Sequence, residues 1–543
     1  MTNFDRLALL FLGMLLFAPG INSRDLWNPD EPRYAQIARE MLDSGEFLVP
    51  HLNGRVYTEK PPLHFWSIAL FGWLRAGVDE VAARLPSLFF AIATLSVLFE
   101  LTRLLLDARS AWWAVLIFGS TVKILWQARV GQIDMGLIFW VTLATLSVVR
   151  RVVRGGKQPA WGFWIATGLG TLAKGPVALL PPLFGLIAWG RVDRSLELKR
   201  ILRPLHGFLL WVFIVASWLV PASLRAGGEY FETLLLKQNL ERYADPWHHH
   251  QPWYYYLTVL PGDFFPWSFF LPGALLLRRR LSGAQRRAFD FSICWALATL
   301  LFFSVSPAKR TVYILTMYPA LALLVSLSFR EMAREAALLR RWLLIPTAVL
   351  ASLLTVSAAI LGWILFHPRE RFFAQLNELD FLGPTWRQWV LLLAIVLSCG
   401  ALLAALHALR NEPGGVVFSL STSLAVVATI ASVWVLPRFD SVKSPRLLAK
   451  TFLQQATSAD PYGIWPRLDA NVVFYTGRFT TEIRTEAELR HFAEGPGRRW
   501  LFAKRDRWEK LNPPITGFQE VARDADSREG YLLLLRENPP AEN

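Results

Sequence analysis

The chain has 543 residues, of which 53% are hydrophobic and only 18% are charged. A soluble enzyme would carry about a quarter charged residues, so the composition argues against a soluble globular protein. The formal net charge is +15, but we expect no nucleic-acid partner, because much of the excess lies in short loops between apolar segments, as the bias toward cytoplasmic Lys and Arg predicts.

In chain order, apolar runs of roughly 18–22 residues predict transmembrane helices. The first run follows a short N-terminus and is expected to be an uncleaved helix, since many further runs follow it. The segment 61–76 is expected to be a re-entrant or interfacial helix. About thirteen spans are predicted, at residues 6–22, 83–104, 110–126, 133–150, 159–173, 175–190, 205–224, 256–277, 289–306, 311–329, 342–365, 387–409 and 416–436.

Basic residues predict the orientation of these spans. Alternate loops are rich in Lys and Arg, which indicates the cytoplasmic side. The predicted cytoplasmic N-terminus then leaves the long loops 22–82, 225–255 and 366–386 on the non-cytoplasmic side. The basic loop residues are Arg150, Arg151, Arg154, Lys157, Arg191, Arg194, Lys199, Arg200, Arg203, Arg278, Arg279, Arg280, Arg286, Arg287, Arg330, Arg334, Arg340 and Arg341.

The composition changes after Pro437. Short apolar segments at Asn471–Tyr475, Arg499–Phe502 and Gly530–Leu535 predict strands, and polar stretches such as Thr485–Ala493 predict helices. We therefore expect two parts: a polytopic α-helical membrane domain over residues 1–437, and a small soluble α/β domain over residues 438–543 on the non-cytoplasmic side.

The first long loop begins with the sequence Asp-Leu-Trp-Asn-Pro-Asp-Glu-Pro-Arg-Tyr-Ala, which ends at Ala35. Asp30 and Glu31 are adjacent carboxylates, and Arg33 follows them. This pattern is typical of a general base beside an anion-binding guanidinium. It is equally typical of a helix start, where Asn28 or Asp30 would cap the first turn and acidic residues are favoured. Spacing alone leaves both interpretations open.

The same loop continues with Tyr57-Thr-Glu-Lys-Pro-Pro. Lys60 suits a lipid phosphate, and Glu59 suits a metal ion. The alternative is an interfacial anchor, in which a charged pair and aromatic residues lie at the membrane surface.

Four further places carry ionisable or aromatic residues at the predicted outer face. Asp134 begins a span, and Lys174 lies between two short spans, where charged groups are costly and often functional unless they lie just outside the hydrocarbon. The three histidines that end at His250, beside aromatic residues, could supply one or two metal ligands or simply belong to an interfacial belt. Lys309, Arg310 and Tyr313 suit a phosphate and a lipid or sugar.

These segments resemble a known family. The strings WNPDEPRYAQIAREML and VPHLNGRVYTEKPPLHFW, followed by QIDMGL, LAKGP, HHQPWYYY and SPAKRTVYIL, are similar to the lipid A 4-amino-4-deoxy-L-arabinose transferases. Those enzymes are GT-C glycosyltransferases, related to protein O-mannosyltransferases. The resemblance covers about residues 5–330, whereas the later spans and the tail domain match in layout only.

The resemblance implies a bacterial inner-membrane enzyme that takes a sugar from a polyprenyl (undecaprenyl) phosphate and gives it to an envelope acceptor such as lipid A on the periplasmic face. It implies catalytic roles for Asp30, Arg33 and Asp134. It also implies substrate contacts for Tyr57, Lys60 and Tyr313, and a divalent metal, such as zinc, at Glu59 and His249. The basic pair Lys309 and Arg310 is expected to bind substrate because of its charge.

Two alternatives stay open at this point. The first is a related transferase that uses mannose, glucose or galacturonic acid on a protein or glycan acceptor. The second is a lipid or sugar transporter, which would need paired ionisable residues deep within its spans rather than at one rim. Nucleotide hydrolysis and zinc proteolysis have no support, because the sequence has no Walker loop and no HExxH motif.

Overall fold

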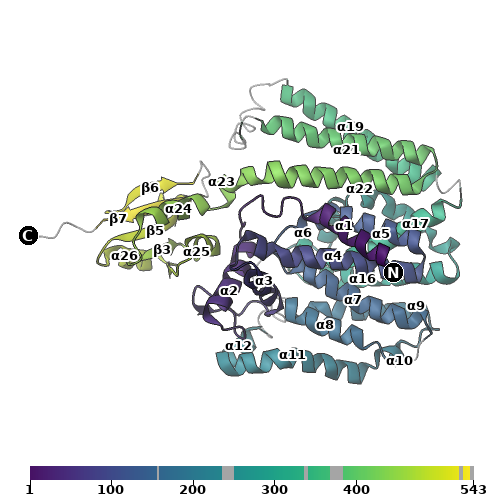
Figure 1. Ribbon diagram of the computed structural model, residues 1–543, viewed down its shortest axis with the longest axis horizontal. Coiled ribbons are helices and arrows are strands. Elements are labelled where there is room, and N and C mark those ends of the chain that lie inside the picture. Colours follow the sequence, from purple (N-terminus) through teal and green to yellow (C-terminus); the bar gives the residue numbers. More distant parts are fainter. Residues whose placement is uncertain are drawn as a thin grey trace, which may run out of the picture.

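The computed structural model describes residues 1–155, 158–234, 250–335, 340–366, 383, 385–524 and 530–537. It consists of a broad bundle of helices with a small β-sheet domain at one end (Figure 1). This architecture confirms the predicted fold class, a polytopic helical membrane protein with a C-terminal α/β domain.

Helices dominate the N-terminal half because apolar segments in lipid must pair their backbone groups internally. Acidic side chains begin several of them: the Asp79 carboxylate accepts from the Ala82 backbone N–H at 2.7 Å at the start of α4. The α-helices up to residue 232 are α1 (Asn3–Phe17), α2 (Asp30–Ser44), α3 (Leu63–Leu74), α4 (Glu80–Leu105), α5 (Ala108–Ser120), α6 (Val122–Gln127), α7 (Asp134–Val153), α8 (Trp161–Lys174), α9 (Leu180–Val192), α10 (Leu198–Leu202), α11 (Pro204–Ala226) and α12 (Gly228–Glu232).

The bundle continues after residue 250 with a mixture of α-helices and shorter helical turns. Its α-helices are α14 (Tyr255–Asp263), α15 (Leu271–Leu276), α16 (Gly283–Val305), α17 (Tyr318–Met332), α19 (Ile345–Phe366), α21 (Trp386–Leu409), α22 (Pro413–Ile430) and α23 (Asp440–Lys443). The 3-10 and π turns are η1 (Pro176–Ala178), η3 (Trp267–Phe270), η4 (Leu277–Arg280), η5 (Thr311–Met317), η6 (Arg340–Leu344), η8 (Ala431–Val435) and η9 (Leu436–Phe439).

Helices occupy all thirteen positions at which spans were predicted, but fewer are long enough to cross a bilayer. Within the described residues, eight are long and apolar enough. The count is nine if the bent pair Tyr255–Asp263 and Trp267–Arg280, which meet at 110°, forms one span. The shorter helices have visible stops: α8, for example, ends at Gly175, whose φ of 99° few other residues adopt. The apolar runs therefore predicted the positions of the helices correctly. The predicted number of spans was too high, because some of these helices end before they are long enough to cross a bilayer.

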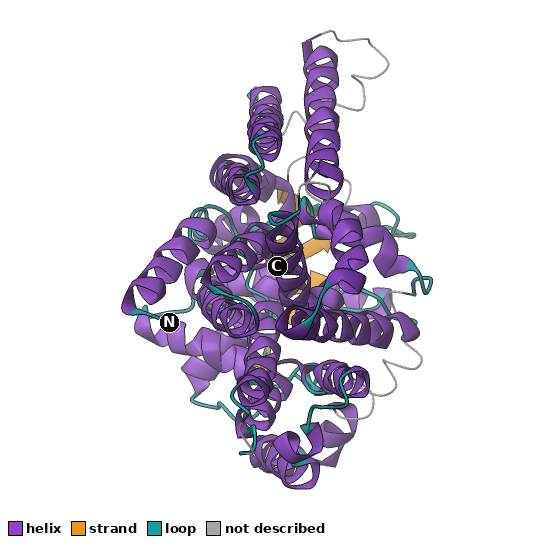
Figure 2. Cartoon of the chain, turned by 90° about the vertical axis from the view of Figure 1, so that its right-hand side faces the viewer, coloured by secondary structure: helices purple, strands orange, loops and turns teal. Residues whose placement is uncertain are grey.

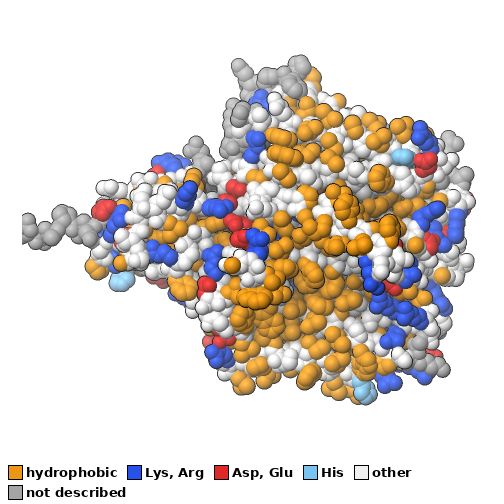
Figure 3. Space-filling view, viewed as in Figure 1, with side chains coloured by type: hydrophobic (Ala, Val, Ile, Leu, Met, Phe, Trp, Pro, Cys, Tyr) orange, Lys and Arg blue, Asp and Glu red, His pale blue; other side chains and the backbone are white. Residues whose placement is uncertain are grey.

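The long helices differ in how much of their surface other helices cover. The span Thr311–Met332 is almost wholly buried, as expected of a helix that is apolar on every side. By contrast, only about a fifth of the residues are buried in the spans formed by α11, α19 and α21. Hydrophobic side chains cover the middle of the molecule (Figure 3), which is the surface that a lipid bilayer solvates.

The C-terminal domain is built on a five-stranded sheet in the order β4-β3-β5-β7-β6. The strands β3, β4 and β5 run parallel, whereas β7 is antiparallel to both β5 and β6. The strands are β3 (Tyr462–Trp465), β4 (Thr481–Glu482), β5 (Arg499–Lys504), β6 (Gln519–Arg523) and β7 (Tyr531–Arg536), and the helices are α24 (Arg446–Gln455), α25 (Ala470–Thr476), α26 (Glu486–Glu494) and α27 (Arg505–Trp508).

Two of the three predicted strands are confirmed as β5 and β7, and the predicted helix at Thr485–Ala493 is confirmed as α26. The strand predicted at Asn471–Tyr475 was wrong, because this segment forms α25. A short apolar run fits either element. Here the Asp469 carboxylate caps the first turn, and Gly477 follows the helix with a φ of 63°, so the flanking residues favour the helix.

The sheet domain and the basic loops lie at opposite ends of the bundle. In Figure 1 the sheet is at the left, whereas the N-terminus, α9 and α10 are at the right. Figure 3 shows Lys and Arg side chains gathered at that right-hand end, and Figure 2 views the molecule from there, with the strands behind the helices. The loop 22–82 folds at the sheet end as α2, the hairpin of β1 (His51–Leu52) and β2 (Arg55–Val56), and α3.

Candidate active site

A cavity opens at the sheet end of the bundle and collects side chains from six parts of the chain. It encloses about 930 Å³ of empty space, part of it open to solvent. Carboxylates and cations face one another across it, beside aromatic and apolar groups. The lining residues that carry polar or aromatic side chains are Asp30, Tyr34, Glu59, Lys60, Asp134, Lys174, Phe303, Ser306, Arg310 and Tyr313.

Asp30 begins α2 and lies in the wall of the cavity. One of its carboxylate oxygens accepts from the Gln132 amide at 3.0 Å, and the same oxygen lies 3.6 Å from the Arg310 guanidinium. Asp30 therefore begins a helix, as one interpretation of the sequence held, and also points into the cavity. The two interpretations do not exclude each other. The expected cap was wrong, because Pro29 is the N-cap and neither Asn28 nor Asp30 caps the turn.

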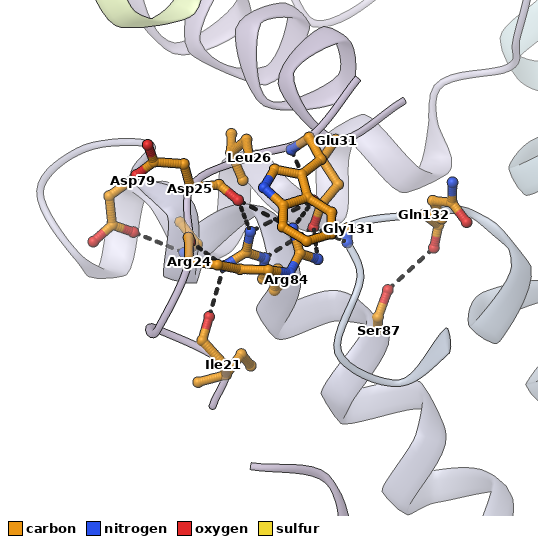
Figure 4. Close-up of polar contacts among 12 residues, drawn as sticks. Ile21, Arg24, Asp25, Leu26, Glu31, Asp79, Arg84, Ser87, Gly131 and Gln132 are labelled. Carbon is orange, nitrogen blue, oxygen red and sulfur yellow. Dashed lines mark hydrogen bonds and ion pairs between the residues drawn. The ribbon is translucent and has the colours of Figure 1, made fainter. Parts of the chain in front are cut away.

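The neighbouring Glu31 has a different environment. It is 2% exposed, and its carboxylate lies 2.6 Å from Arg24 and 2.8 Å from Arg84 (Figure 4). It also accepts from the backbone N–H of Gly131 at 2.9 Å. Burial alone would raise the pKa of Glu31, but Arg84 and Arg24 outweigh burial and lower it to about 2. Glu31 is thus a buried anion that joins α2 to α4 and to the segment before α7.

Asp134 and Lys174 form an ion pair in the cavity wall, between the start of α7 and the end of α8. The Lys174 ammonium also lies 5.3 Å from the centre of the Tyr313 ring. Asp134 receives a further hydrogen bond from the Gln127 amide at 3.4 Å. This arrangement holds a cation beside an aromatic face, where it can meet a phosphate or a sugar.

Glu59 lies across the cavity in the loop between β2 and α3. Its carboxylate is 3.2 Å from the Arg33 guanidinium and accepts from the Tyr57 hydroxyl at 3.3 Å. Burial, reinforced by the Glu59 charge, raises the pKa of Tyr57 above its ordinary range, so this hydroxyl stays a neutral donor. Glu59 and Lys60 line the cavity. Arg33 and Tyr57 do not line it, but they bind the Glu59 carboxylate.

Lys309 and Arg310 were predicted to bind phosphate together, but their side chains lie in different places. Arg310 lines the cavity, and its pKa is raised because Asp30 and Asp134 outweigh the effect of burial. The buried Lys309 ammonium donates instead to the backbone carbonyls of Ser306 at 2.5 Å and Gln251 at 3.1 Å. It is not among the lining residues. Lys309 therefore joins the segment that follows α16 to the backbone at Gln251.

The predicted metal site is described only in part. Glu59 is present, but its carboxylate already accepts from a guanidinium and a hydroxyl. His249 lies outside the described residues. Within the residues that the structure describes, no three His, Cys, Asp or Glu side chains are grouped as a metal ion requires. The described residues do not by themselves fit a metal centre, and the chemistry below uses none.

The structure adds site residues that the sequence did not single out. Tyr34 is one helical turn after Asp30, and this spacing could have placed both on one face of α2. Gln132, which bonds Asp30, lies two residues before Asp134. Lys174, by contrast, was already a functional candidate as a charge at membrane depth, but its partner was not predicted. Its pairing with Asp134 depends on the packing of α7 against α8, which no local pattern reveals.

Comparisons with known proteins identify the family to which the chain belongs. The chain is 31% identical to the undecaprenyl phosphate-alpha-4-amino-4-deoxy-L-arabinose arabinosyl transferase of Pectobacterium carotovorum over 415 residues, which cover 73% of this chain and 72% of that protein. The chain belongs to this arabinosyl transferase family. Residues 4–226 also match the family model described as dolichyl-phosphate-mannose-protein mannosyltransferase. The chain is therefore a multi-pass membrane glycosyltransferase, and the resemblance noted from its sequence is confirmed.

Two other comparisons extend the match. The arabinosyl transferase of Pectobacterium atrosepticum is 30% identical over 375 residues, which cover 67% of this chain and 66% of that protein. The crystal structure of ArnT from Cupriavidus metallidurans, bound to undecaprenyl phosphate, superimposes with a TM-score of 0.80. The superposition covers 99% of this chain and 100% of that one at 20% identity. It shows that the fold extends through the later spans and the C-terminal domain.

Proposed function

We propose that this chain transfers 4-amino-4-deoxy-L-arabinose from undecaprenyl phosphate to lipid A at the periplasmic face of the bacterial inner membrane. The observation that carries this proposal is the match to the arabinosyl transferase family over most of the chain. The donor follows from the names of the relatives, whereas the acceptor follows from the resemblance of the loop motifs. The charged cavity lies in the part of the chain that carries those motifs.

The proposed reaction is a single displacement at the anomeric carbon of the sugar. An acceptor oxygen forms a bond to that carbon, and the bond from the carbon to the donor phosphate oxygen breaks. Undecaprenyl phosphate leaves with the bonding electrons, so negative charge develops on its phosphate. Cations that face this oxygen stabilise the transition state more than the ground state. An in-line displacement of this kind inverts the configuration of the anomeric carbon.

The cavity supplies the groups that this step needs. Lys60, Lys174 and Arg310 are cations in its wall that can meet the donor phosphate. Asp30 accepts the acceptor proton, or only orients the acceptor where that group is a phosphate that is already ionised. Tyr313 offers an aromatic face to the sugar. Arg33 and Tyr57 hold Glu59 in place beside Lys60.

A purified-protein assay with the lipid-linked donor tests the proposal. Asp30→Asn keeps the shape of the side chain but removes its charge, and general-base catalysis is worth roughly 10²–10⁴ in rate. We expect turnover to fall by at least about a hundredfold. Asp43→Asn is the matched control, because Asp43 is exposed on the same helix. Near-normal turnover in Asp30→Asn would refute the role of this carboxylate.

The identity of the sugar and acceptor needs a separate experiment. Mass spectrometry of lipid A from a deletion strain should show the loss of aminoarabinose, and the intact gene should restore it. In vitro, only the aminoarabinose donor should be consumed from a panel of undecaprenyl-phosphate sugars. Consumption of a mannose, glucose or galacturonic acid donor instead would assign the chain to a different reaction within the same superfamily.

We also propose the orientation predicted from the loops, with the N-terminus in the cytoplasm and the C-terminal domain in the periplasm. The separation of the basic end of the bundle from the sheet end supports it. A divalent cation bound by Glu59 and His249 is a further proposal, which rests on the resemblance of the loop motifs alone. Dependence of activity on added metal tests it.

A further inference from the structure

We infer that the C-terminal domain is a positioning part of the active site, in which Asn471 and Tyr475 hold the backbone that leads into Asp30. The inference rests on the proposed role of Asp30. The residues concerned lie on α25, which packs against α2 although the two are more than 400 residues apart in sequence (Figure 1). Neither residue lines the cavity, so they would act through the segment Asp25–Asn28.

Both backbone groups of Leu26 are hydrogen-bonded to the C-terminal domain. The Leu26 N–H donates to the Tyr475 hydroxyl at 2.8 Å, and the Asn471 amide donates to the Leu26 carbonyl at 3.0 Å. Leu26 and Asn471 are both fully buried. A buried backbone group without a partner costs free energy, so loss of either side chain would favour a different path for this segment.

The residues on both sides of Leu26 are attached to the same domain or to the helix that leads to it. The Asp25 carboxylate lies 2.7 Å from the Arg446 guanidinium, and the Asn28 amide donates to Asp469 at 3.0 Å. The Trp27 indole N–H donates to Asp440 at 2.7 Å, and Asp440 also accepts from the Asp25 N–H at 3.0 Å. Every residue of the segment Asp25–Asn28 therefore has a partner beyond residue 439.

The geometry of α25 explains how two of its residues reach one backbone unit. Asn471 and Tyr475 are four positions apart, so they lie on the same face of the helix. A neighbouring contact secures the same helix against α2: the Arg39 guanidinium donates to the Phe474 carbonyl at 2.7 Å and lies 4.0 Å from the centre of the Phe474 ring. α25 is thus held against the helix that carries Asp30.

Hydrogen bonds from the helix bundle hold the same segment on its other side. Arg84 donates to the carbonyls of Arg24 at 2.9 Å and Asp25 at 2.6 Å (Figure 4), and Trp27 donates its backbone N–H to Glu31 at 3.1 Å. The segment before Asp30 is therefore bonded on one side to the bundle and on the other to the sheet domain. Loss of both bonds to Leu26 removes the two partners of this buried backbone unit, which lies four residues before Asp30.

Turnover measurements on full-length variants test this inference. Tyr475→Phe removes the hydroxyl that accepts from Leu26, and Asn471→Ala removes the amide. Tyr462→Phe is the matched control, since its buried hydroxyl bonds only within the domain, to Thr476 and Arg478. A displacement of about 1 Å at a reacting group costs up to roughly a hundredfold in rate. We expect the double variant Asn471→Ala/Tyr475→Phe to lose roughly ten- to a hundredfold in kcat, while Tyr462→Phe stays within about twofold.

The binding stoichiometry of undecaprenyl phosphate, the lipid carrier that the reaction releases, separates positioning from loss of folded protein. In the double variant, undecaprenyl phosphate should still bind with wild-type stoichiometry and a nearly unchanged Kd, because Lys60, Lys174 and Arg310 lie outside the contact. A fall in stoichiometry that matches the fall in kcat would indicate unfolding and refute the inference. So would a double variant with the kcat of Tyr462→Phe. If instead Asp30→Asn keeps near-normal turnover, the proposed role of Asp30 fails, whatever the α25 variants show, whereas a wild type that transfers no aminoarabinose would overturn the proposed function itself.

Discussion

Adjacent carboxylates at the start of α2 should have opposite mutant phenotypes. Glu31→Gln keeps the shape of the side chain but leaves Arg84, which is 0% exposed, beside a neutral group. Loss of one partner from a buried ion pair costs about 3–5 kcal/mol. The pKa of Glu31 gives a similar value: its shift from 4.5 to about 2 corresponds to about 3 kcal/mol at 1.36 kcal/mol per unit. We therefore expect Glu31→Gln to lower the free energy of unfolding by about 3–5 kcal/mol.

Asp30→Asn should behave differently, because within the described part of the chain the Asp30 carboxylate has one hydrogen bond, from Gln132, and a 3.6 Å contact with Arg310. We expect a stability change below about 1.5 kcal/mol, with loss of turnover. Denaturant titration of both variants in detergent micelles, followed by tryptophan fluorescence, measures the difference. Equal stability of Glu31→Gln and the wild type would refute the reasoning, as would a larger loss in Asp30→Asn.

The pH dependence of stability provides an independent measurement on the same residue. The folded pKa of Glu31 is depressed, so its contribution is fully present above the unfolded pKa of about 4.5. It is lost as the pH falls from that value toward 2. The wild type should therefore lose about 3 kcal/mol more than Glu31→Gln over this interval. Parallel stability curves for the two proteins would contradict the assigned ion pair.

The remaining predictions concern the donor, the metal and the orientation. Lys60→Gln should raise the Kd for undecaprenyl phosphate at least about tenfold, since a charge-assisted contact is worth about 1.5–3 kcal/mol, while Lys199→Gln at the basic end leaves it unchanged. Chelation with EDTA should abolish turnover and zinc should restore it if Glu59 and His249 bind a metal; full activity after chelation would remove the metal from the proposal. An alkaline phosphatase fusion after Glu537 should be active and a fusion after Arg154 inactive, and the reverse pattern would invert the proposed orientation.

Local features of the sequence were sufficient to predict where helices occur in the bundle and that the loop 22–82 lies at the end opposite to the basic loops. Apolar runs report on helices directly, because a segment in lipid must pair its own backbone groups. Likewise, the motifs identified Asp30, Glu59, Lys60, Asp134, Arg310 and Tyr313, all of which line one cavity. Local patterns failed at Asn471–Tyr475, where a short apolar run fits a strand as well as a helix.

Tertiary structure decided which of these residues act together. Nothing in the order Asp30-Glu31 indicates that the first side chain faces a cavity while the second is buried between Arg24 and Arg84. Likewise, the pairing of Lys174 with Asp134 depends on how α7 and α8 pack, and the bonds to Leu26 depend on the position of α25. The physical reason is range: the periodicity of apolar residues and the capping of helices act over a few neighbours, whereas these contacts join segments that only the packing of the whole chain brings together.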